Sequence, residues 1–487
     1  MAQERYIKGR QKKYGPCALS MNVMQVKRQE MIGTAVGGLS LFIFCLILLS
    51  GCQADQSADP RKAAKQGDAR AQNSLGIMYT AGDRVPQDLT QAVQWFRKAA
   101  EQGFAEAQNN LGISYRDGKG VQKDYTQAVE WVRKAAKQNL AIAQYNLGLM
   151  YAKGNGVGQD YTEAVEWYRK AAEQGNSDAQ FQLGAMFYHG LGIKQDHRQA
   201  VEWYRKAAGQ GIADAPFLIG VMYYNGEGVK RDPKQAVEWY RIAAEQGDAA
   251  AQHHLGLMYC NGEGVKQDPE QAVEWIRKAA EQGNARAQND LGEKYSYGLG
   301  VKQDHKQAVE WFRKAAEQGD AKAQRNLGVR YYTGEGVKQD PKQVLEWIRK
   351  AAEQGDVVSQ ISLGNMYTEG EGVKQDQIQA VKWYRKAAEQ GDAKAQLLLG
   401  IRYYKGEGVK QDYEQAVAWY RKASEQGYPE AQHNLGFMYY QGMGVKQDQE
   451  QGIELLLKAA RQGFDRAKRT LRDLRALPKS NVPKQAK

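Results

Sequence analysis

The sequence contains little cysteine and little histidine for its 487 residues. Three of the four cysteines lie within the first 52 residues and only Cys260 lies beyond them, so a disulfide framework does not hold the chain together. The six histidines show no metal-ligand spacing. The one Cys/His cluster joins His253 and His254 to Cys260, but seven helical steps, about 10 Å of rise, separate His253 from the thiol. We therefore predict no metal, no cofactor and no enzymatic activity.

The net charge is also close to zero over most of the chain. The formal charge is +12, but residues 1–51 hold seven basic and two acidic residues, and residues 464–487 hold eight and two. The stretch 52–463 is left with a net charge of only +1. A groove for nucleic acid needs basic side chains that follow the phosphates, so we predict no nucleic-acid partner. We interpret the basic C-terminal end as a solvated terminus.

The chain is rich in repetition. Its ten tryptophans stand at positions 95, 131, 167, 203, 239, 275, 311, 347, 383 and 419, and every gap is 36 residues. A fixed period of this size is typical of stacked copies of one unit rather than of a globular core. Eleven full repeats begin at Asp68, Phe104, Leu140, Asn176, Ile212, Asp248, Asn284, Asp320, Asp356, Asp392 and Tyr428.

Each repeat is predicted to form two helices joined by a turn. In the repeat that begins at Asn176, apolar residues recur at steps of three and four between Ala179 and Phe187, as on one face of a helix. Gly190 is placed to end this first helix. Asp196 then caps a second helix, and an aspartate stands at this position in all eleven repeats.

The second helix has one charged face and one apolar face. In the third repeat the charged face consists of Glu166, Arg169, Lys170 and Glu173. We predict that Trp167, on the other face, is a buried side chain that fills the gap between repeats. A glycine in the middle of every first helix, such as Gly184, costs about 1 kcal/mol relative to alanine, so we expect close contact there with a partner helix.

Three first helices carry a charge where a methionine is common. They are Lys294, Arg330 and Arg402. Because a buried charge is costly, we expect this position to be only half covered.

The repeated residues resemble a known family. The pattern A-Q-x-x-L-G-x-M-Y-x-x-G-x-G-V-x-x-D-x-x-x-A-V-x-W-Y-R-K-A-A-E-Q-G, matched throughout by Ala143–Gly175, is similar to the Sel-like repeat, a relative of the tetratricopeptide repeat (TPR). The resemblance covers Asp68–Gly463. It implies an all-α fold, a right-handed α-solenoid of antiparallel helix pairs built from 36-residue TPR-like repeats. It also implies a protein-interaction scaffold. The first repeat departs from the pattern, because Gly82-Asp83-Arg84-Val85 stands where the others have Gly-x-Gly-Val, which makes its turn geometry uncertain.

An export signal is predicted at the N-terminus. The uncharged apolar run Ile32–Leu49 follows two basic residues, as in a signal peptide. It ends in Leu49-Ser50-Gly51-Cys52, which resembles the lipobox of bacterial lipoproteins and implies cleavage before Cys52 and lipidation of that residue. Gln53 follows in place of an aspartate, which favours the outer membrane of the cell envelope. A single-pass membrane anchor is the alternative, because 18 mostly apolar residues approach the length of a membrane span.

We divide the chain into five segments. They are a basic leader with the lipoprotein signal (1–51), a short linker with a partial capping helix (52–67), eleven repeats (68–463), a C-terminal capping helix (464–477) and a disordered tail (478–487).

A candidate binding surface emerges when the repeats are compared with one another. Second helices change little, whereas first helices vary at the fifth, ninth and twelfth residues after each repeat's start, which share one face. We call these positions the first-helix face. In the family this face lines the concave side. The predicted partner-binding residues are Tyr145, Phe181, Tyr188, Phe217, Tyr224, His253, Tyr332 and Tyr404. Drift of surface residues, or packing between repeats, is the alternative interpretation.

The sequence predicts an exported, lipid-anchored repeat scaffold that binds protein or peptide partners. Two alternatives remain open at this point. One is a cell-envelope enzyme, or a protein that binds glycan or muropeptide in the same groove. The other is a structural spacer.

Overall fold

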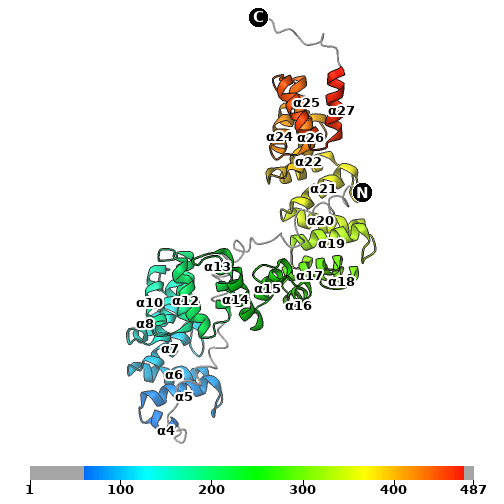
Figure 1. The fold of residues 1–487 in the computed structure, drawn as a ribbon. Helices are drawn as coiled ribbons and strands as arrows, with labels where there is room; N and C mark the ends of the chain where they lie inside the picture. Colours follow the sequence, from blue (N-terminus) through cyan, green and yellow to red (C-terminus); the bar gives the residue numbers. More distant parts are fainter. Residues whose placement is uncertain (1–59, 477–487) are drawn as a thin grey trace. The chain divides into compact units, whose positions relative to one another are not determined.

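The computed structural model describes residues 60–476. The leader, the lipidation site predicted at Cys52 and the predicted tail therefore lie outside the described residues. Within 60–476 the chain forms 24 helices and no strands, and consecutive helices run antiparallel (Figure 1). The chain divides into two compact bodies, which we describe separately as the N-terminal body (60–268) and the C-terminal body (269–476).

The N-terminal body begins with the short helix α4 (Pro60–Lys65). Its first helices are α5 (Ala69–Ala81), α7 (Ala105–Asp117), α9 (Ala141–Lys153), α11 (Ser177–His189), α13 (Asp214–Asn225) and α15 (Ala249–Asn261). Its second helices are α6 (Leu89–Glu101), α8 (Tyr125–Lys137), α10 (Tyr161–Glu173), α12 (His197–Gly209) and α14 (Pro233–Glu245). Each second helix packs against the first helices before and after it in the chain, as in a solenoid.

The C-terminal body begins with a second helix, α16 (Pro269–Glu281). Its first helices are α17 (Ala285–Tyr297), α19 (Ala321–Thr333), α21 (Val357–Glu369), α23 (Ala393–Lys405) and α25 (Pro429–Gln441). Its other second helices are α18 (His305–Glu317), α20 (Pro341–Glu353), α22 (Gln377–Glu389), α24 (Tyr413–Glu425) and α26 (Gln449–Arg461). The last helix, α27 (Asp465–Ala476), packs on α26.

The predicted helix boundaries are confirmed by their caps. One oxygen of Asp196 accepts hydrogen bonds from the backbone N–H groups of Arg198 (2.9 Å) and Gln199 (3.1 Å), which satisfies donors that the helix itself leaves unpaired. Nine other second helices have an aspartate in the same role. On the other side of the same turn, Gly190 ends α11 in the left-handed conformation, with φ of 68°.

The divergent first turn keeps the geometry of the others. Arg84 stands where the other repeats have glycine and adopts a φ of 57°, in the left-handed region. Asn139, which replaces a glycine at the end of α8, does the same with a φ of 65°. Its side chain accepts hydrogen bonds from Gln144 (3.0 Å) and Gln174 (3.2 Å). The stack of helices therefore imposes the turn even where the residue is unfavourable.

Candidate functional site

The tryptophans that mark the period are partly exposed in nine repeats, and only Trp347 is buried. We expected buried indoles. Trp167 and Trp203 do pack against the core of the neighbouring repeat, but a lysine one turn further along covers the open ring face. Lys206 Nζ lies 3.8 Å from the ring centroid of Trp203, and Lys170 Nζ lies 4.3 Å from that of Trp167. The lysines of the charged face thus have a structural role as cation–π partners.

The side chain that follows each of these tryptophans packs against the glycine in the middle of a first helix. The ring of Tyr204 is buried against α11, and a Cβ atom on Gly184 would lie 2.8 Å from Cδ1 of that ring. The same contact joins Gly148 to Tyr168 and Gly292 to Phe312. The prediction of close contact at this glycine is confirmed, and in these three repeats the nearest group is an aromatic ring.

The arginine of the W-Y-R-K motif reaches into the next repeat. Its guanidinium donates to a tyrosine hydroxyl 18 residues later, as in Arg97 to Tyr115 (2.6 Å) and Arg385 to Tyr403 (2.7 Å). For Arg169 of the third repeat, the residue 18 positions later is Phe187. A phenylalanine has no hydroxyl to accept the bond. These bonds link consecutive helix pairs within each body.

Two glutamines per repeat complete this framework. Gln108, buried in the first helix, donates to the backbone carbonyl of Ala100 (3.1 Å) and accepts from the side chain of Gln138 (2.8 Å). The arrangement recurs along both bodies. Because a buried amide needs such partners, both glutamines serve the fold. The four positions of the W-Y-R-K motif, the first-helix glycine and both glutamines therefore have structural partners, and the variable first-helix face is the candidate site.

In the N-terminal body three of the predicted partner-binding residues are buried. They are Phe181, Phe217 and His253. Ring centroids of Phe181 and Tyr204 lie 5.4 Å apart, and those of Phe217 and Tyr240 lie 5.9 Å apart. Packing within the fold therefore occupies much of these side chains.

The tyrosines of this face lie nearer the surface. Tyr188 donates its hydroxyl to Glu227 Oε2 (2.7 Å), and Tyr224 donates to Glu263 Oε2 (2.8 Å). Burial, followed by the bonded carboxylate, raises the pKa of each phenol above its usual value. Tyr145 is partly buried against Tyr168, with ring centroids 5.9 Å apart. Each phenol therefore stays neutral and can donate a hydrogen bond at ordinary pH.

In the C-terminal body the predicted face residues differ in exposure. Tyr332 is 53% exposed. Tyr404 is partly buried, and its ring centroid lies 5.5 Å from that of Tyr413. The structure divides the chain between Tyr224 and Tyr332, so the predicted residues form two groups, one in each body.

A polar cluster on this face was not predicted. Asn326 donates to Asn289 Oδ1 (2.9 Å) and to Glu293 Oε1 (3.2 Å). Burial, and then the charge of Asp290, raises the pKa of Glu293 to about 6. Arg325 beside the cluster forms an ion pair of 2.6 Å with Asp356. The signal that could have revealed the cluster is a pair of amide residues 37 positions apart on adjacent first helices.

The expectation for the three charged residues in place of methionine was wrong for two of them. Lys294 is 5% exposed and Arg330 is 7% exposed, so both are buried rather than half covered. Burial lowers the pKa of Lys294, while Asp290 and Glu293 oppose that shift. Arg330 is ion-paired with Glu335 in the turn that follows it. The cost of burial is thus offset by acidic partners nearby.

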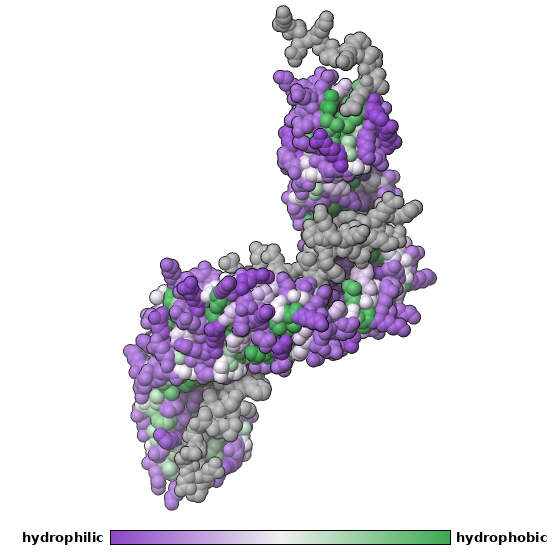
Figure 2. All heavy atoms as spheres, viewed as in Figure 1, coloured by the Kyte–Doolittle hydropathy of each residue, from purple (hydrophilic) through white to green (hydrophobic). Residues whose placement is uncertain are grey.

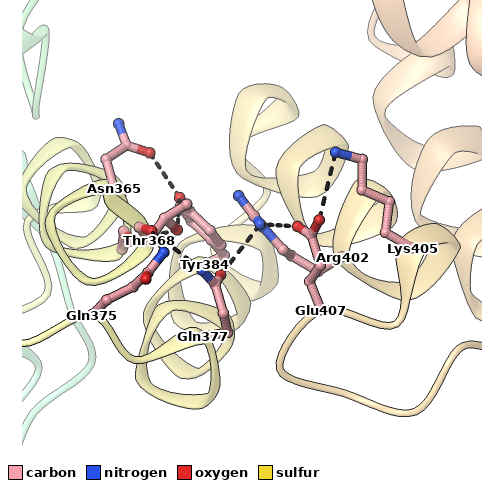
Figure 3. Close-up of polar contacts among 9 residues, drawn as sticks. Asn365, Thr368, Gln375, Gln377, Tyr384, Arg402, Lys405 and Glu407 are labelled. Atoms are coloured by element: carbon pink, nitrogen blue, oxygen red, sulfur yellow. Dashed lines mark hydrogen bonds and ion pairs between the residues drawn. The ribbon is translucent and has the colours of Figure 1, made fainter. Parts of the chain in front are cut away.

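Arg402, the third of these residues, is part of a chain of contacts shown in Figure 3. It is ion-paired with Glu407, which also lies 3.6 Å from Lys405, and it donates to Gln377 Oε1 at 3.3 Å. Its guanidinium lies over the ring of Tyr384. These contacts join α22 to α23, and hydrogen bonds of the Tyr384 hydroxyl with Asn365 (2.8 Å) and Thr368 (3.0 Å) extend them to α21.

The described residues offer little else that resembles a reactive centre. No group of three or more His, Cys, Asp or Glu side chains within 60–476 is placed to hold a metal ion. Among the helices described there, none combines the length and the apolar character needed to cross a membrane. On the side drawn in Figure 2, apolar residues form small patches among polar ones in each body.

Comparison with known proteins agrees with this architecture. A model of the Sel1 repeat matches eleven consecutive segments between residues 69 and 464. A protective antigen from uropathogenic Escherichia coli strains, which displays an SLR fold, is 42% identical over 86% of this chain and 91% of that one, with a TM-score of 0.72. A Sel1 repeat protein from Oxalobacter formigenes is 35% identical over 66% of this chain and 93% of that one, with a TM-score of 0.52. No curated protein matches the chain.

Proposed function

The chain belongs to the Sel1 repeat family, and from this premise we propose that it is an exported, lipid-anchored scaffold that binds protein or peptide partners through its first-helix face. Sel1 repeat proteins are scaffolds of the TPR-like superfamily that generally take part in protein interactions. The members similar to this chain are typically not enzymes.

One observation carries the proposal. Every constant residue of the W-Y-R-K motif has a structural partner, as do both glutamines of the repeat. The first-helix face, in contrast, varies along the chain: its fifth position holds an amide in Asn73, an aromatic ring in Phe181 and a charge in Arg325. A scaffold keeps its framework residues uniform and varies the surface that meets the partner.

The tyrosines of this face are the side chains best suited to hold a partner. Tyr188 and Tyr224 combine a large apolar ring with a hydroxyl already oriented by a carboxylate. Such residues contribute strongly to binding because little conformational freedom is lost. Tyr145 belongs to the same face of the N-terminal body, where the buried Phe181, Phe217 and His253 support it. Tyr332 and Tyr404 form a separate group in the C-terminal body.

Partner capture tests the proposal. The full-length protein is crosslinked in isolated cell envelopes, purified under denaturing conditions and analysed for attached protein and muropeptide. The test variant is Tyr188→Ala with Tyr224→Ala. The matched control is Tyr125→Ala with Tyr161→Ala, two partly buried tyrosines that start second helices of the same body.

We expect a specific protein to be captured by the wild type and the control but lost from the test variant, with helicity by circular dichroism unchanged. Capture that survives in the test variant contradicts the role of the face. Attached muropeptide in place of protein supports a cell-wall ligand, and an absence of any attached species supports a spacer.

Membrane attachment through Cys52 is the second part of the proposal. It is supported by the sequence Leu49-Ser50-Gly51-Cys52 after an apolar run. Metabolic labelling with an alkyne fatty acid should mark the wild type and Cys45→Ser but not Cys52→Ser. Label that persists in Cys52→Ser, or an intact leader found by mass spectrometry of the purified protein, argues for the single-pass anchor instead.

A further inference from the structure

The ninth repeat differs from the others at the surface of its second helix, α22. Ile378 is 60% exposed, and the other ten repeats have a polar residue at this position. Four residues later Lys382 stands where eight repeats have glutamate. Both substitutions lie on the same side of the helix, at positions i and i+4.

The lysine changes the sign of the charged face. Arg385 and Lys386 follow Lys382 at the third and fourth positions, where the usual glutamate pairs with a cation. The contact between Glu346 and Lys350, at 2.7 Å in α20, is an example. In α22 Lys382, Arg385 and Lys386 lie together instead, and Glu389 is the one acid left on this face and in the lining of the recess, so it offsets the like-charge repulsion only in part. A repeat that breaks the local rule in this way without a gain in packing indicates a functional demand.

These residues line a recess with a volume of about 450 Å³. It lies between α22 and the turn that precedes α24, whose Gly408 packs directly on the backbone of Gln377. Ile378, Trp383 and Val409 provide its apolar lining. Two of its cations are held in place, since Arg385 donates to Tyr403 (2.7 Å) and Lys386 covers the ring of Trp383 at 4.2 Å.

The equivalent junction in the N-terminal body shows that the shape alone is not special. A recess of about 380 Å³ there is lined by Arg198, Val229, Lys230 and two glycines of the turn. This recess contains two cations, Arg198 and Lys230, but its lining includes neither an exposed isoleucine nor a tryptophan. The apolar lining and the basic rim occur together at α22.

We propose that this recess is a second binding site, separate from the first-helix face, that takes an acidic protein segment carrying one large apolar side chain. The apolar side chain enters the recess against Ile378 and Val409. Its acidic neighbours pair with Lys382 and the adjacent cations, which a partner of opposite charge complements. Binding of such a segment covers the solvent-exposed isoleucine and relieves the repulsion among the cations.

Fluorescence anisotropy of a labelled nine-residue peptide tests the site, with the full-length protein in detergent. The peptide has a central leucine between aspartates and glutamates; two comparison peptides replace the leucine by serine or the acids by lysines. The protein variants are Lys382→Glu and Ile378→Lys, which restore residues used by other repeats and change only exposed positions. We expect saturable binding by the wild type, weakened at least tenfold by Lys382→Glu and at least fivefold by Ile378→Lys.

A gain of function provides the matched control. Lys306→Ile with Glu310→Lys gives α18 the same pattern as α22, so this variant should bind two peptides per chain. Tyr188→Ala with Tyr224→Ala should leave peptide binding unchanged, which separates this site from the proposed first-helix face.

The proposal is overturned if the wild type does not bind the acidic peptide or if both single variants bind it equally well. Equal binding of the serine or lysine peptide overturns it too, because the chemistry would then be different. Binding to phosphatidylglycerol vesicles that Lys382→Glu abolishes, without binding of the peptide, assigns the patch to a membrane surface instead.

Discussion

Lys206 Nζ lies 3.8 Å from the centre of the Trp203 ring, one helical turn away on α12. Nine of the ten tryptophans have a lysine in this position, at distances up to 4.3 Å. The exception is Trp239, which is followed by Ile242, an isoleucine that is 41% exposed. The periodic indole therefore packs against the core on one side and, in nine repeats, lies under a lysine on the other.

Replacing Ile242 by lysine should stabilise the N-terminal body. The new ammonium can cover the Trp239 ring, and an exposed cation–π contact contributes about 0.5–1 kcal/mol. Lys206→Met removes the same contact from Trp203 and should cost a similar amount. Urea denaturation followed by circular dichroism measures both changes. Equal midpoints for the wild type and both variants would show that the stacking contributes nothing to stability.

Adding a hydroxyl to Phe187 should create the one arginine–tyrosine hydrogen bond that the third repeat lacks. Phe187→Tyr places a hydroxyl 18 residues after Arg169, as in Arg133 and Tyr151, whose bond is 3.1 Å. A net gain of about 0.5–1.5 kcal/mol is expected from one hydrogen bond. Tyr151→Phe serves as the reverse control and should lose a comparable amount in the same denaturation experiment. A loss of stability in Phe187→Tyr contradicts this account.

The sequence predicted what depends on local rules. The 36-residue period, the aspartate caps and the glycine ends of helices follow from residues within a few positions of one another. It did not predict the bond between Gln138 and Gln108, or that between Asn326 and Asn289, because the partners are 30 and 37 residues apart. Such pairings become visible only when the offset between stacked helices is known.

The sequence predicted which residues lie on the candidate face, but it did not predict which of their side chains are exposed. Spacing placed Phe181 and Tyr188 on one side of a first helix, yet only the neighbouring second helix decides which of them is covered. Tyr204 contacts Phe181, whereas the hydroxyl of Tyr188 reaches Glu227 in the next repeat. The burial of Lys294 was unexpected for a related reason, since its acidic neighbours offset a cost that we had assigned to an isolated charge.

Adding one methyl group at the helix crossing should destabilise the stack. Gly184→Ala gains about 1 kcal/mol of helix propensity, but its Cβ would lie 2.8 Å from the buried ring of Tyr204. Overpacking of this kind costs about 1–3 kcal/mol, so we expect a net loss. Gly209→Ala, at the end of the helix that packs on this glycine, is the matched control. A Cβ there meets nothing within 4 Å, and the change should stabilise. If Gly184→Ala is as stable as Gly209→Ala, the glycine is not needed for the close approach.

Stability should depend on pH through Glu293. Burial, and then the charge of Asp290, raises the pKa of its carboxyl from 4.5 to about 6, while Arg325 and the amides of Asn326 and Asn289 oppose the shift. Between these two pH values the folded protein binds more protons than the unfolded chain, so the free energy of unfolding falls as pH rises from about 4.5 through 6. Above pH 6 the ionised Glu293 carboxylate lowers the free energy of unfolding by on the order of 1–2 kcal/mol. Glu293→Gln should remove it, making the variant more stable at pH 7.5 but not at pH 4. Urea denaturation at the two pH values measures the difference. The solvent-exposed Glu310→Gln is the control, and an equal response of both variants would place the pH dependence elsewhere.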